Sequence, residues 1–548
     1  MKKILDLLKR NRIMLGAIFT MGAFSSLYLA TRTWAFSYDA LTAALTAERN
    51  GVFPFHPNHL FGSGLGWVFY QWIIRAGTPA RALFVFQTVN AVTSGLTVGY
   101  FFYLLAKRFS VRAGILGATG LGLSFAYWSE SVDAGAYSIA GLLGVYLLEN
   151  LLRLSQDRNE GTASGPLTLL AMGLGMGVAI LVHQMFLLTL PSFLILLLFS
   201  VPPFSPQEKT KRFYLFVLGV FLTGILPYAV IAHSYYDFGL REGLFWFLGP
   251  AGPRPDSGIL INSWWQWTVF QNVLPSWRGL VGCLAAPPPA PWGWLHPLAQ
   301  GGLGVSLILF CLGSYRVYFQ EVQKRPLLLA ALAWILAMNI FQFFWAPGII
   351  RFRLLFLPIL FVWGLLSLDG LPDRGKKYIG KSSPLFLFLI LGFGLSNAVG
   401  TIIPSTRIEN NRSIVRTLWI GQTVGPNDFF LFSGSGDSVT NVVPPYFAPH
   451  VPSRSLYGYF FANPSGNFSE IAVTIEQTLR QGGSVYIEEP LFRKEAWKGL
   501  ARDEAMAVEI LSKWFSRYER DSVLEGPFNY SVAKIRNVGI SNSSAERF

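Results

Sequence analysis

Cysteine and charged residues are both scarce in this sequence. Of 548 residues only two are cysteines and 14% are charged, whereas 52% are hydrophobic and 15% aromatic. Cys283 lies in a stretch rich in Trp and Pro and Cys311 within an apolar run, so they are poor disulfide partners without metal-ligand spacing. A soluble domain of this composition would not have enough polar surface to cover itself. The composition therefore predicts a polytopic membrane protein.

The formal net charge of +14 would in another context suggest binding to nucleic acid. Before residue 404, however, Lys and Arg lie mainly in short segments between apolar runs, which is how membrane topology is encoded. We therefore expect no nucleic-acid partner. The basic start, MKKILDLLKRNR, and the long apolar run at 13–31 predict a retained signal anchor, since no clear cleavage site follows.

A membrane-spanning helix needs about 20 mostly apolar residues. Eleven segments qualify: 13–32, 82–106, 113–129, 134–153, 166–184, 186–201, 213–233, 298–318, 327–346, 353–370 and 384–403. A twelfth apolar run, 60–76, is shorter and rich in glycine. If it does not span, the basic clusters between spans fall on the cytoplasmic side with the N-terminus, as the positive-inside rule expects. We therefore predict an interfacial or re-entrant helix at 60–76 on the outer side.

The composition changes to that of a soluble domain after residue 403. Residues 428–433, 484–489 and 530–536 are expected to be strands, and 469–481 and about 491–518 to be helices. A G-S-G-D stretch at 434–437 lacks the full dinucleotide fingerprint and favours a plain loop. The sequence thus predicts a transmembrane domain at 1–403 and an extracytoplasmic α/β domain at 404–548.

Polar residues that a simple connection would not need follow the first predicted span. Asp39 lies close to Trp34 and Phe36, where partial desolvation would raise its pKa and let it take a proton from a hydroxyl nucleophile. Capping a helix is the alternative role of this residue. His56 and His59 would orient a substrate or, alternatively, form an interfacial turn, and they make a weak metal signature.

Further polar residues are predicted at outer ends of the spans. Glu130 and Asp133 occupy an outer hairpin and suggest either a polar cavity or solvated turn residues. His183 ends a span. Arg351 and Arg353 fall near headgroup depth, where guanidinium groups either hold a lipid phosphate or snorkel to ordinary headgroups.

Taken in order, these stretches resemble the GT-C superfamily of membrane glycosyltransferases, and within it the protein O-mannosyltransferase-like enzymes. The likeness consists of Asp39 followed by His56-Pro57, then W-S-E-S-V-D-A-G-A-Y at 128–137, then G-V-A-I-L-V-H-Q with His183, and a proline, Pro191, in the next span. It covers about the first 200 residues. Beyond them only the architecture is alike.

The resemblance implies a GT-C-like fold and a polyprenyl-phosphate-linked sugar donor at the outer membrane face. Asp39 would act as the general base, and an acceptor hydroxyl would attack the anomeric carbon with inversion. Arg351 and Arg353 would neutralise the departing phosphate. Three further residues would shape the cavity: His56, Glu130 and His183. Gly135 stands where relatives often carry Glu in the W-S stretch, a departure that puts the role of this stretch in question.

The expected partners are the lipid-linked donor, a protein, glycan or lipid acceptor, and membrane lipids. No cofactor is implied, and a role for a divalent cation stays open. The expected location is a bacterial inner membrane. Two alternatives remain: a transporter or flippase of lipid-linked sugars, although no inverted repeat is evident, and a non-catalytic protein that binds them.

Overall fold

The structure is a computed structural model that describes residues 2–50, 53, 59–159, 165–198, 205–234, 237–239, 241–243, 247, 269–286, 295–369, 387–388, 390–434, 439–456, 469–492, 516 and 518–537. The predicted site residue His56 and most of the predicted helix at 491–518 lie outside these ranges. The chain divides into two compact units, which we describe separately. One comprises Met1–Thr33 and Thr46–Pro404, the other Trp34–Leu45 and Ser405–Phe548.

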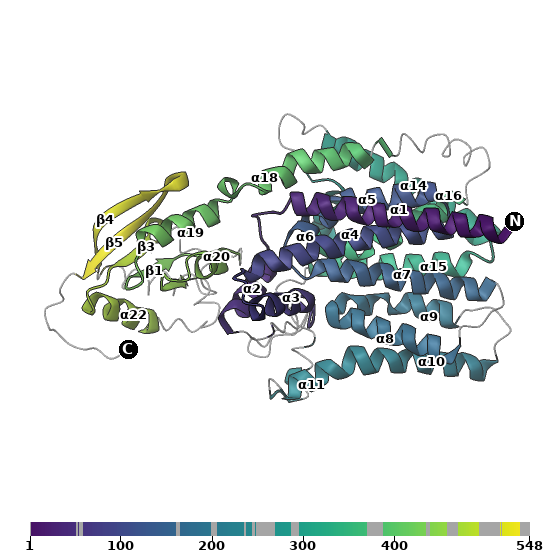
Figure 1. Ribbon diagram of the computed structural model, residues 1–548, viewed down its shortest axis with the longest axis horizontal. Helices are drawn as coiled ribbons and strands as arrows, with labels where there is room; N and C mark the ends of the chain where they lie inside the picture. Colours follow the sequence, from purple (N-terminus) through teal and green to yellow (C-terminus); the bar gives the residue numbers. More distant parts are fainter. Residues whose placement is uncertain are drawn as a thin grey trace. The chain divides into compact units, whose positions relative to one another are not determined.

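The first unit is a bundle of apolar helices (Figure 1). Its elements are α1 (Lys2–Ala30), the end of α2 (Tyr38–Asn50), α3 (Gly64–Arg75), α4 (Ala82–Arg108), α5 (Val111–Leu123), α6 (Phe125–Val132), α7 (Tyr137–Asn159), α8 (Pro166–Val182), η1 (Gln184–Thr189), α9 (Leu190–Leu198), α10 (Pro206–Val220), η2 (Phe221–Ile225), α11 (Leu226–Ser234), α13 (Val269–Leu284), α14 (Leu295–Gln320), α15 (Arg325–Trp345), η6 (Arg351–Phe356), α16 (Leu357–Asp369), η7 (Ala398–Ile402) and α18 (Ile403–Ser405).

Within the described residues, seven helical segments are long and apolar enough to cross a membrane, and four shorter apolar helices accompany them. Each of these segments overlaps one of the eleven predicted spans. The prediction of a polytopic helical membrane protein is therefore confirmed. The predicted span at 113–129 is interrupted at Ser124, where α5 ends and α6 begins.

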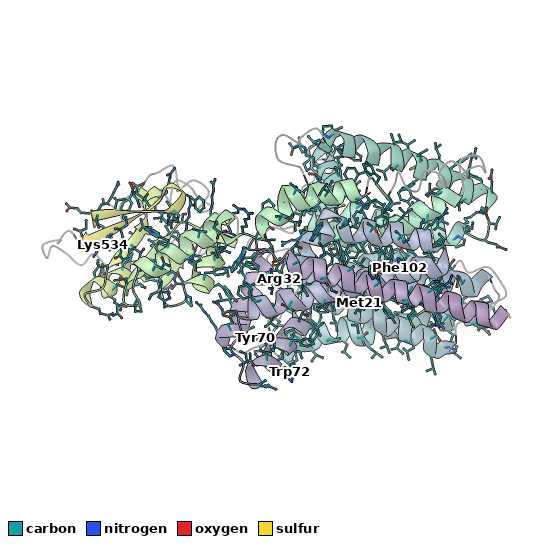
Figure 2. The ribbon with its side chains drawn as sticks, turned by 45° about the horizontal axis from the view of Figure 1, so that its top comes forward. Met21, Arg32, Tyr70, Trp72, Phe102 and Lys534 are labelled. Carbon is teal, nitrogen blue, oxygen red and sulfur yellow. The ribbon has the colours of Figure 1, made fainter. Side chains whose placement is uncertain are left out.

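Helix α3 corresponds to the apolar run that was predicted not to span. It has 12 residues, which at 1.5 Å per residue gives about 18 Å, whereas the hydrocarbon core of a bilayer is about 30 Å thick. Its two faces differ: Tyr70 is buried, while Trp72 is 68% exposed (both labelled in Figure 2). A short helix with one buried face and one exposed apolar face suits the membrane interface.

Helices α1 and α4 lie in close contact because α4 carries glycines on the shared face. An added Cβ at Gly99 would lie 2.7 Å from the carbonyl oxygen of Ala17 and 2.8 Å from Cβ of Met21. Gly95, one turn earlier, is equally crowded by α1. Small residues four apart let helix backbones approach within a membrane, where van der Waals packing drives association. Figure 2 labels Met21 on α1 and Phe102 on α4.

The second unit contains a five-stranded sheet with helices on both faces. Its elements are the start of α2, η8 (Ile408–Asn410), α19 (Arg412–Thr423), β1 (Phe429–Phe432), α20 (Val439–Phe447), β2 (Ser453–Ser455), α22 (Ser469–Arg480), β3 (Val485–Glu488), η9 (Glu489–Phe492), β4 (Tyr518–Gly526), η11 (Pro527–Asn529) and β5 (Tyr530–Asn537). The strand order is β2-β1-β3-β5-β4, with β2, β1 and β3 parallel and β5 antiparallel to both β3 and β4.

The alternation of side chains along β1 builds the two cores of this unit. Phe429 and Leu431 pack with Ile471 of α22 on one face, and Phe430 packs with Ile420 of α19 on the other. This is the period of two expected of a strand that is covered on both sides. The predicted α/β domain is confirmed, as are the strands matching β1, β3 and β5 and the helix α22. Strands β2 and β4 and helices α19 and α20 were not predicted.

The segment after the first span belongs to the second unit. Trp34 N donates a hydrogen bond to the Ser405 carbonyl at 2.7 Å, and Asn411 Nδ2 donates to the Trp34 carbonyl at 2.6 Å. The ring of Phe36 stacks on Phe447 with centroids 6.3 Å apart. The start of α2 is thus held by residues that lie more than 360 positions later in the chain. Residues 34–45 were predicted to belong to the transmembrane domain.

The contact between α1 and α4 predicts how Gly99→Ala will behave. The added methyl group would push against backbone, which cannot rotate away, so we expect a loss of about 1–3 kcal/mol of stability. Thermal unfolding of the protein in detergent measures this loss. Gly22→Ala in α1 is the matched control, because nothing lies within 4 Å of its added Cβ. Equal unfolding temperatures for the two variants would contradict the proposed packing.

Candidate active site

Four side chains from four different segments meet at one end of the helical bundle. The ring of His183 lies 5.1 Å from that of Tyr137 and 5.4 Å from that of His59, centroid to centroid. The guanidinium carbon of Arg351 lies 5.9 Å from the centre of the Tyr137 ring. We call His59, Tyr137, His183 and Arg351 the His–Tyr–Arg cluster. The first three are buried, and Arg351 is half-buried.

The histidines of this cluster are positioned by helix ends and by a glycine. His183 lies between α8 and η1, where its Nδ1 accepts a hydrogen bond from Met185 N at 3.3 Å. In the neutral form its proton is therefore on Nε2. The segment of His59 is fixed to the end of α8, since Phe61 N donates to the Leu181 carbonyl at 3.0 Å. Position 62 has to be glycine, because a Cβ at this position would collide with the side chain of Ala136.

The W-S stretch is held by two amide side chains of α4. Asn90 Nδ2 donates to the carbonyl oxygens of Asp133 at 2.9 Å and Gly135 at 2.6 Å. Gln87 Nε2 donates to the carbonyl of Val132 at 2.7 Å and to that of Thr33 at 2.8 Å. These buried amides satisfy backbone oxygens that have no helical partner where α6 ends. They were missed in the sequence, although two amides on one face of an apolar helix are an informative signal.

Glu130 and Asp133 are buried, with 9% and 5% of their surface exposed. They are therefore not the solvated turn residues that were considered as an alternative. Glu130 lies in α6, and Asp133 is the residue that ends this helix. Tyr137, the last residue of the W-S stretch and the first of α7, belongs to the His–Tyr–Arg cluster.

The two predicted phosphate-binding arginines have different surroundings. Arg351 lies over the rings of Tyr137 and Phe352, at 5.9 and 5.4 Å from their centres. Arg353 is fully buried and donates to three neutral oxygens, on Asn339 at 3.0 Å, Ser276 at 3.1 Å and the Pro347 carbonyl at 2.8 Å. The structure brings Arg351, but not Arg353, to the His–Tyr–Arg cluster. Arg353 instead connects η6 with α13 and α15.

Asp39 lies in the first turn of α2, in the second unit. The capping residue of this helix is Ser37, whose hydroxyl accepts a hydrogen bond from Ala40 N at 3.3 Å. Asp39 lies two residues after Ser37, as the second residue of the helix. A carboxylate in a first turn is favoured by the helix dipole.

Within the described residues, no group of three or more His, Cys, Asp and Glu side chains is arranged to hold a metal ion.

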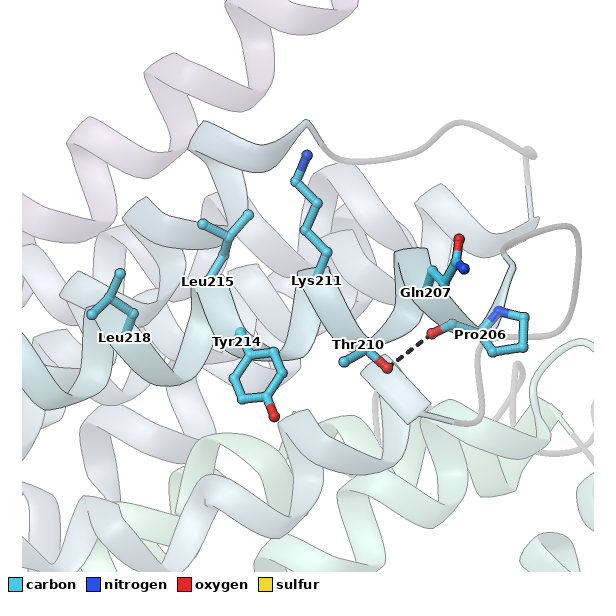
Figure 3. Close-up of a pocket in the computed structure, with 7 residues that line it drawn as sticks. All are labelled: Pro206, Gln207, Thr210, Lys211, Tyr214, Leu215 and Leu218. Carbon is cyan, nitrogen blue, oxygen red and sulfur yellow. Dashed lines mark hydrogen bonds between the residues drawn. The ribbon is translucent and has the colours of Figure 1, made fainter.

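A hollow of about 770 Å³ on α10 is separate from the His–Tyr–Arg cluster (Figure 3). Its lining comes from this one helix, with a hydrogen bond from the Thr210 hydroxyl to the Pro206 carbonyl at 2.9 Å. Tyr214, which lines it, is 65% exposed. An open apolar face of a single helix in a membrane bundle is a surface for lipid, so we place no chemistry here.

Comparison with known proteins gives both a family match and similar folds. Residues 69–204 match the family described as the protein O-mannosyl-transferase TMEM260 N-terminal domain. ArnT from Cupriavidus metallidurans is similar in its apo state, with a TM-score of 0.55 and 13% identity over 94% of this chain and 97% of that chain. The structure of the same protein bound to undecaprenyl phosphate has a TM-score of 0.54 and 12% identity over 96% of this chain and 98% of that chain. No curated protein matches by sequence.

The apo oligosaccharyltransferase of Archaeoglobus fulgidus is also similar, with a TM-score of 0.50 and 13% identity over 98% of this chain and 75% of that chain. The chain has the GT-C fold. This fold, and the match over 69–204, confirm the resemblance to GT-C glycosyltransferases and to protein O-mannosyltransferases. The family match thereby supports the predicted class of enzyme, a membrane glycosyltransferase.

The hydrogen bonds from Asn90 to the W-S stretch predict the effect of Asn90→Leu. The substitution keeps the branched shape of the side chain but removes the amide that donates to two buried carbonyl oxygens, and each lost hydrogen bond of this kind costs about 1–3 kcal/mol. We expect a lower unfolding temperature in detergent. Thr88→Val on the same helix is the control, because its exposed hydroxyl bonds only to the Phe84 carbonyl of its own helix. An unchanged unfolding temperature for Asn90→Leu would show that the amide does not hold this stretch.

Proposed function

We propose that this protein is a glycosyltransferase that moves a sugar from a polyprenyl-phosphate-linked donor to an acceptor hydroxyl at the extracytoplasmic membrane face. One observation carries the proposal: histidine, tyrosine and arginine side chains converge at one end of a bundle that has the GT-C fold. The similar protein ArnT has been solved with undecaprenyl phosphate bound, which supports a lipid phosphate as the donor's carrier.

Arg351 is the residue that we assign to the donor phosphate. Its stacking on Tyr137 and Phe352 orients the planar guanidinium, and a planar fork of N–H donors matches two oxygens of one phosphate. It would stabilise the negative charge that develops as the phosphate leaves. Arg353 is assigned a positioning role, because its hydrogen bonds fix the turn on which Arg351 lies.

The two imidazoles would bind neutral oxygens of the donor. Because Nδ1 of His183 already accepts a hydrogen bond, its Nε2–H is the group that donates. His59 is adjacent, and both are buried, so a hydrogen bond from them would be made in a site with little water.

Asp39 is assigned the role of general base. Its carboxylate would take the proton of the acceptor hydroxyl, whose oxygen attacks the anomeric carbon from the side opposite the phosphate. The bond from that carbon to the phosphate oxygen breaks as the new one forms, so the configuration inverts. The lipid phosphate leaves with the bonding electrons. The resemblance to GT-C enzymes supports the assignment.

The distribution of basic residues supports an extracytoplasmic site. Helix α7 starts at Tyr137 in the His–Tyr–Arg cluster and carries Arg153 about four turns later. Helix α15 begins at Arg325 and ends at Trp345, whose ring lies 4.6 Å from that of Phe352 beside Arg351. In both helices the basic residue lies toward the end opposite the cluster. Because basic helix ends are retained in the cytoplasm, this arrangement supports a cluster on the outer side.

Asp39→Asn tests the catalytic assignment. Removing a general base lowers a rate by about 10²–10⁴-fold, so transfer from a synthetic polyprenyl-phosphate sugar to an acceptor should fall by this factor while donor binding persists. Glu48→Gln in the same helix is the control, since its amide oxygen can still accept from Ala82 N. Transfer at the parental rate by Asp39→Asn would overturn the mechanism, and a transporter would show unchanged flux.

Arg351→Ala tests the donor site. Loss of charge-assisted hydrogen bonds should weaken binding of a polyprenyl phosphate by about tenfold to a hundredfold. The affinity of Arg351→Lys should lie between that of Arg351→Ala and that of the parent. Arg325→Ala is the matched control, because Arg325 also stacks on a tyrosine, with its guanidinium 4.8 Å from the Tyr318 ring centre. Equal affinities for the Arg351 and Arg325 variants would place the phosphate elsewhere.

A further inference from the structure

The second unit contains a cavity of about 210 Å³ that the transfer reaction does not use. It lies where the parallel strands β1 and β3 end: Ser433 and Gly434 follow β1, and Glu488 is the last residue of β3. In the order β2-β1-β3-β5-β4, the chain leaves β1 toward β2 and leaves β3 toward the opposite edge. Ligands bind preferentially at such a switch point in open α/β sheets.

The walls of the cavity come from the helices on the same face of the sheet. Apolar side chains, among them Phe430 and Phe432, line it together with six polar side chains besides Glu488: Ser413, Arg416, Thr417, Ser433, Thr440 and Tyr530. Gly434 has a φ of 63°, a conformation that favours glycine, so no side chain enters at the end of β1.

A carboxylate with fixed orientation forms one side of the cavity. Glu488 Oε2 accepts hydrogen bonds from Ser433 N at 2.8 Å and from its hydroxyl at 2.5 Å, and Oε1 accepts from the Tyr530 hydroxyl at 2.7 Å. Burial, followed by the charge of Glu488, raises the pKa of Tyr530, so this hydroxyl keeps its proton and remains a donor. A carboxylate has about four acceptor positions, and these three bonds leave one for a ligand.

A guanidinium forms another side. The guanidinium carbon of Arg416 lies 4.8 Å from the centre of the Tyr530 ring, and NH2 donates to the Phe528 carbonyl at 3.2 Å. Its Nε is buried and has no hydrogen-bond partner among the described residues. A buried donor without a partner is costly, and a ligand oxygen would relieve that cost.

Size and charge narrow the class of ligand. The volume is below the roughly 300 Å³ at which drug-sized sites begin, so the occupant is a small molecule or a single residue of a larger one. The Glu488 carboxylate would repel an anion, and the Arg416 guanidinium would repel a cation. A neutral ligand rich in hydroxyl groups can donate to the first and accept from the second, and its apolar face can pack on aromatic rings.

We propose that this cavity is a binding site for one neutral saccharide residue, separate from the site of transfer. The proposal does not depend on the glycosyltransferase assignment, because it would hold equally if the chain were a transporter.

Saturation-transfer NMR on the full-length protein in detergent tests the site, with methyl α-mannopyranoside, methyl β-glucopyranoside and methyl β-galactopyranoside as probes. We expect at least one glycoside to receive saturation, and its affinity to fall about tenfold or more in Glu488→Gln and in Arg416→Gln. The matched controls are Glu489→Gln, in the ion pair with Arg520, and Arg412→Gln, one turn earlier on α19. Neither control residue lines the cavity, so both should bind as the parent does.

Three outcomes would overturn the proposal. The first is that no glycoside receives saturation from a folded parent protein. The second is that the cavity variants, with unfolding temperatures like those of the controls, bind as well as the controls do. The third is that inorganic sulfate displaces the glycoside, which would indicate an anion site. If Glu488→Gln fails to fold, the glycoside affinity of Arg416→Gln, a variant on another element, decides between these outcomes. Asp39→Asn should leave glycoside binding to this cavity unchanged, so the outcome of the binding test is distinguishable from that of the transfer assay.

Discussion

The whole candidate site depends on one requirement, that backbone oxygens buried among apolar helices find hydrogen-bond donors. The W-S stretch leaves α6 and enters α7 through a short non-helical turn, and in an apolar surrounding its carbonyl groups have no water to bind. Asn90 and Gln87 of α4 supply four hydrogen bonds to this turn and to Thr33. These hydrogen bonds hold the turn, and Tyr137 opens α7 in contact with His183.

Close approach is the second constraint, and it is met by residues without side chains. Gly99 lets α1 lie against α4, so that the helix bearing the two amides is itself held in place. Gly62 has the same role beside Ala136, where the segment of His59 meets the turn. Packing in a membrane relies on van der Waals contact, and one methyl group in either place would move elements that the site needs.

The elements that were predicted correctly are those whose signal lies within a short window. Helix α3 was assigned as non-spanning from its length and from the charges around it, and β1, β3 and β5 from their apolar alternation. Helix α19 was missed. Helix α20 and strand β2 were also missed, because α20 contains two prolines and β2 has three residues. Ser37, two residues before Asp39, is the cap of α2, and the exact start of a helix is not visible in sequence.

The membrane architecture follows from the sequence alone, because hydropathy and charge act residue by residue along the chain. The sequence also pointed to His183 and Arg351 as functional residues. Only the tertiary structure decided that His59, Tyr137, His183 and Arg351 meet, and that Arg353 is enclosed among neutral oxygens two residues away. These contacts join segments that are far apart in the chain, such as Tyr137 and Arg351, and their geometry is set by helix packing, which no local pattern encodes.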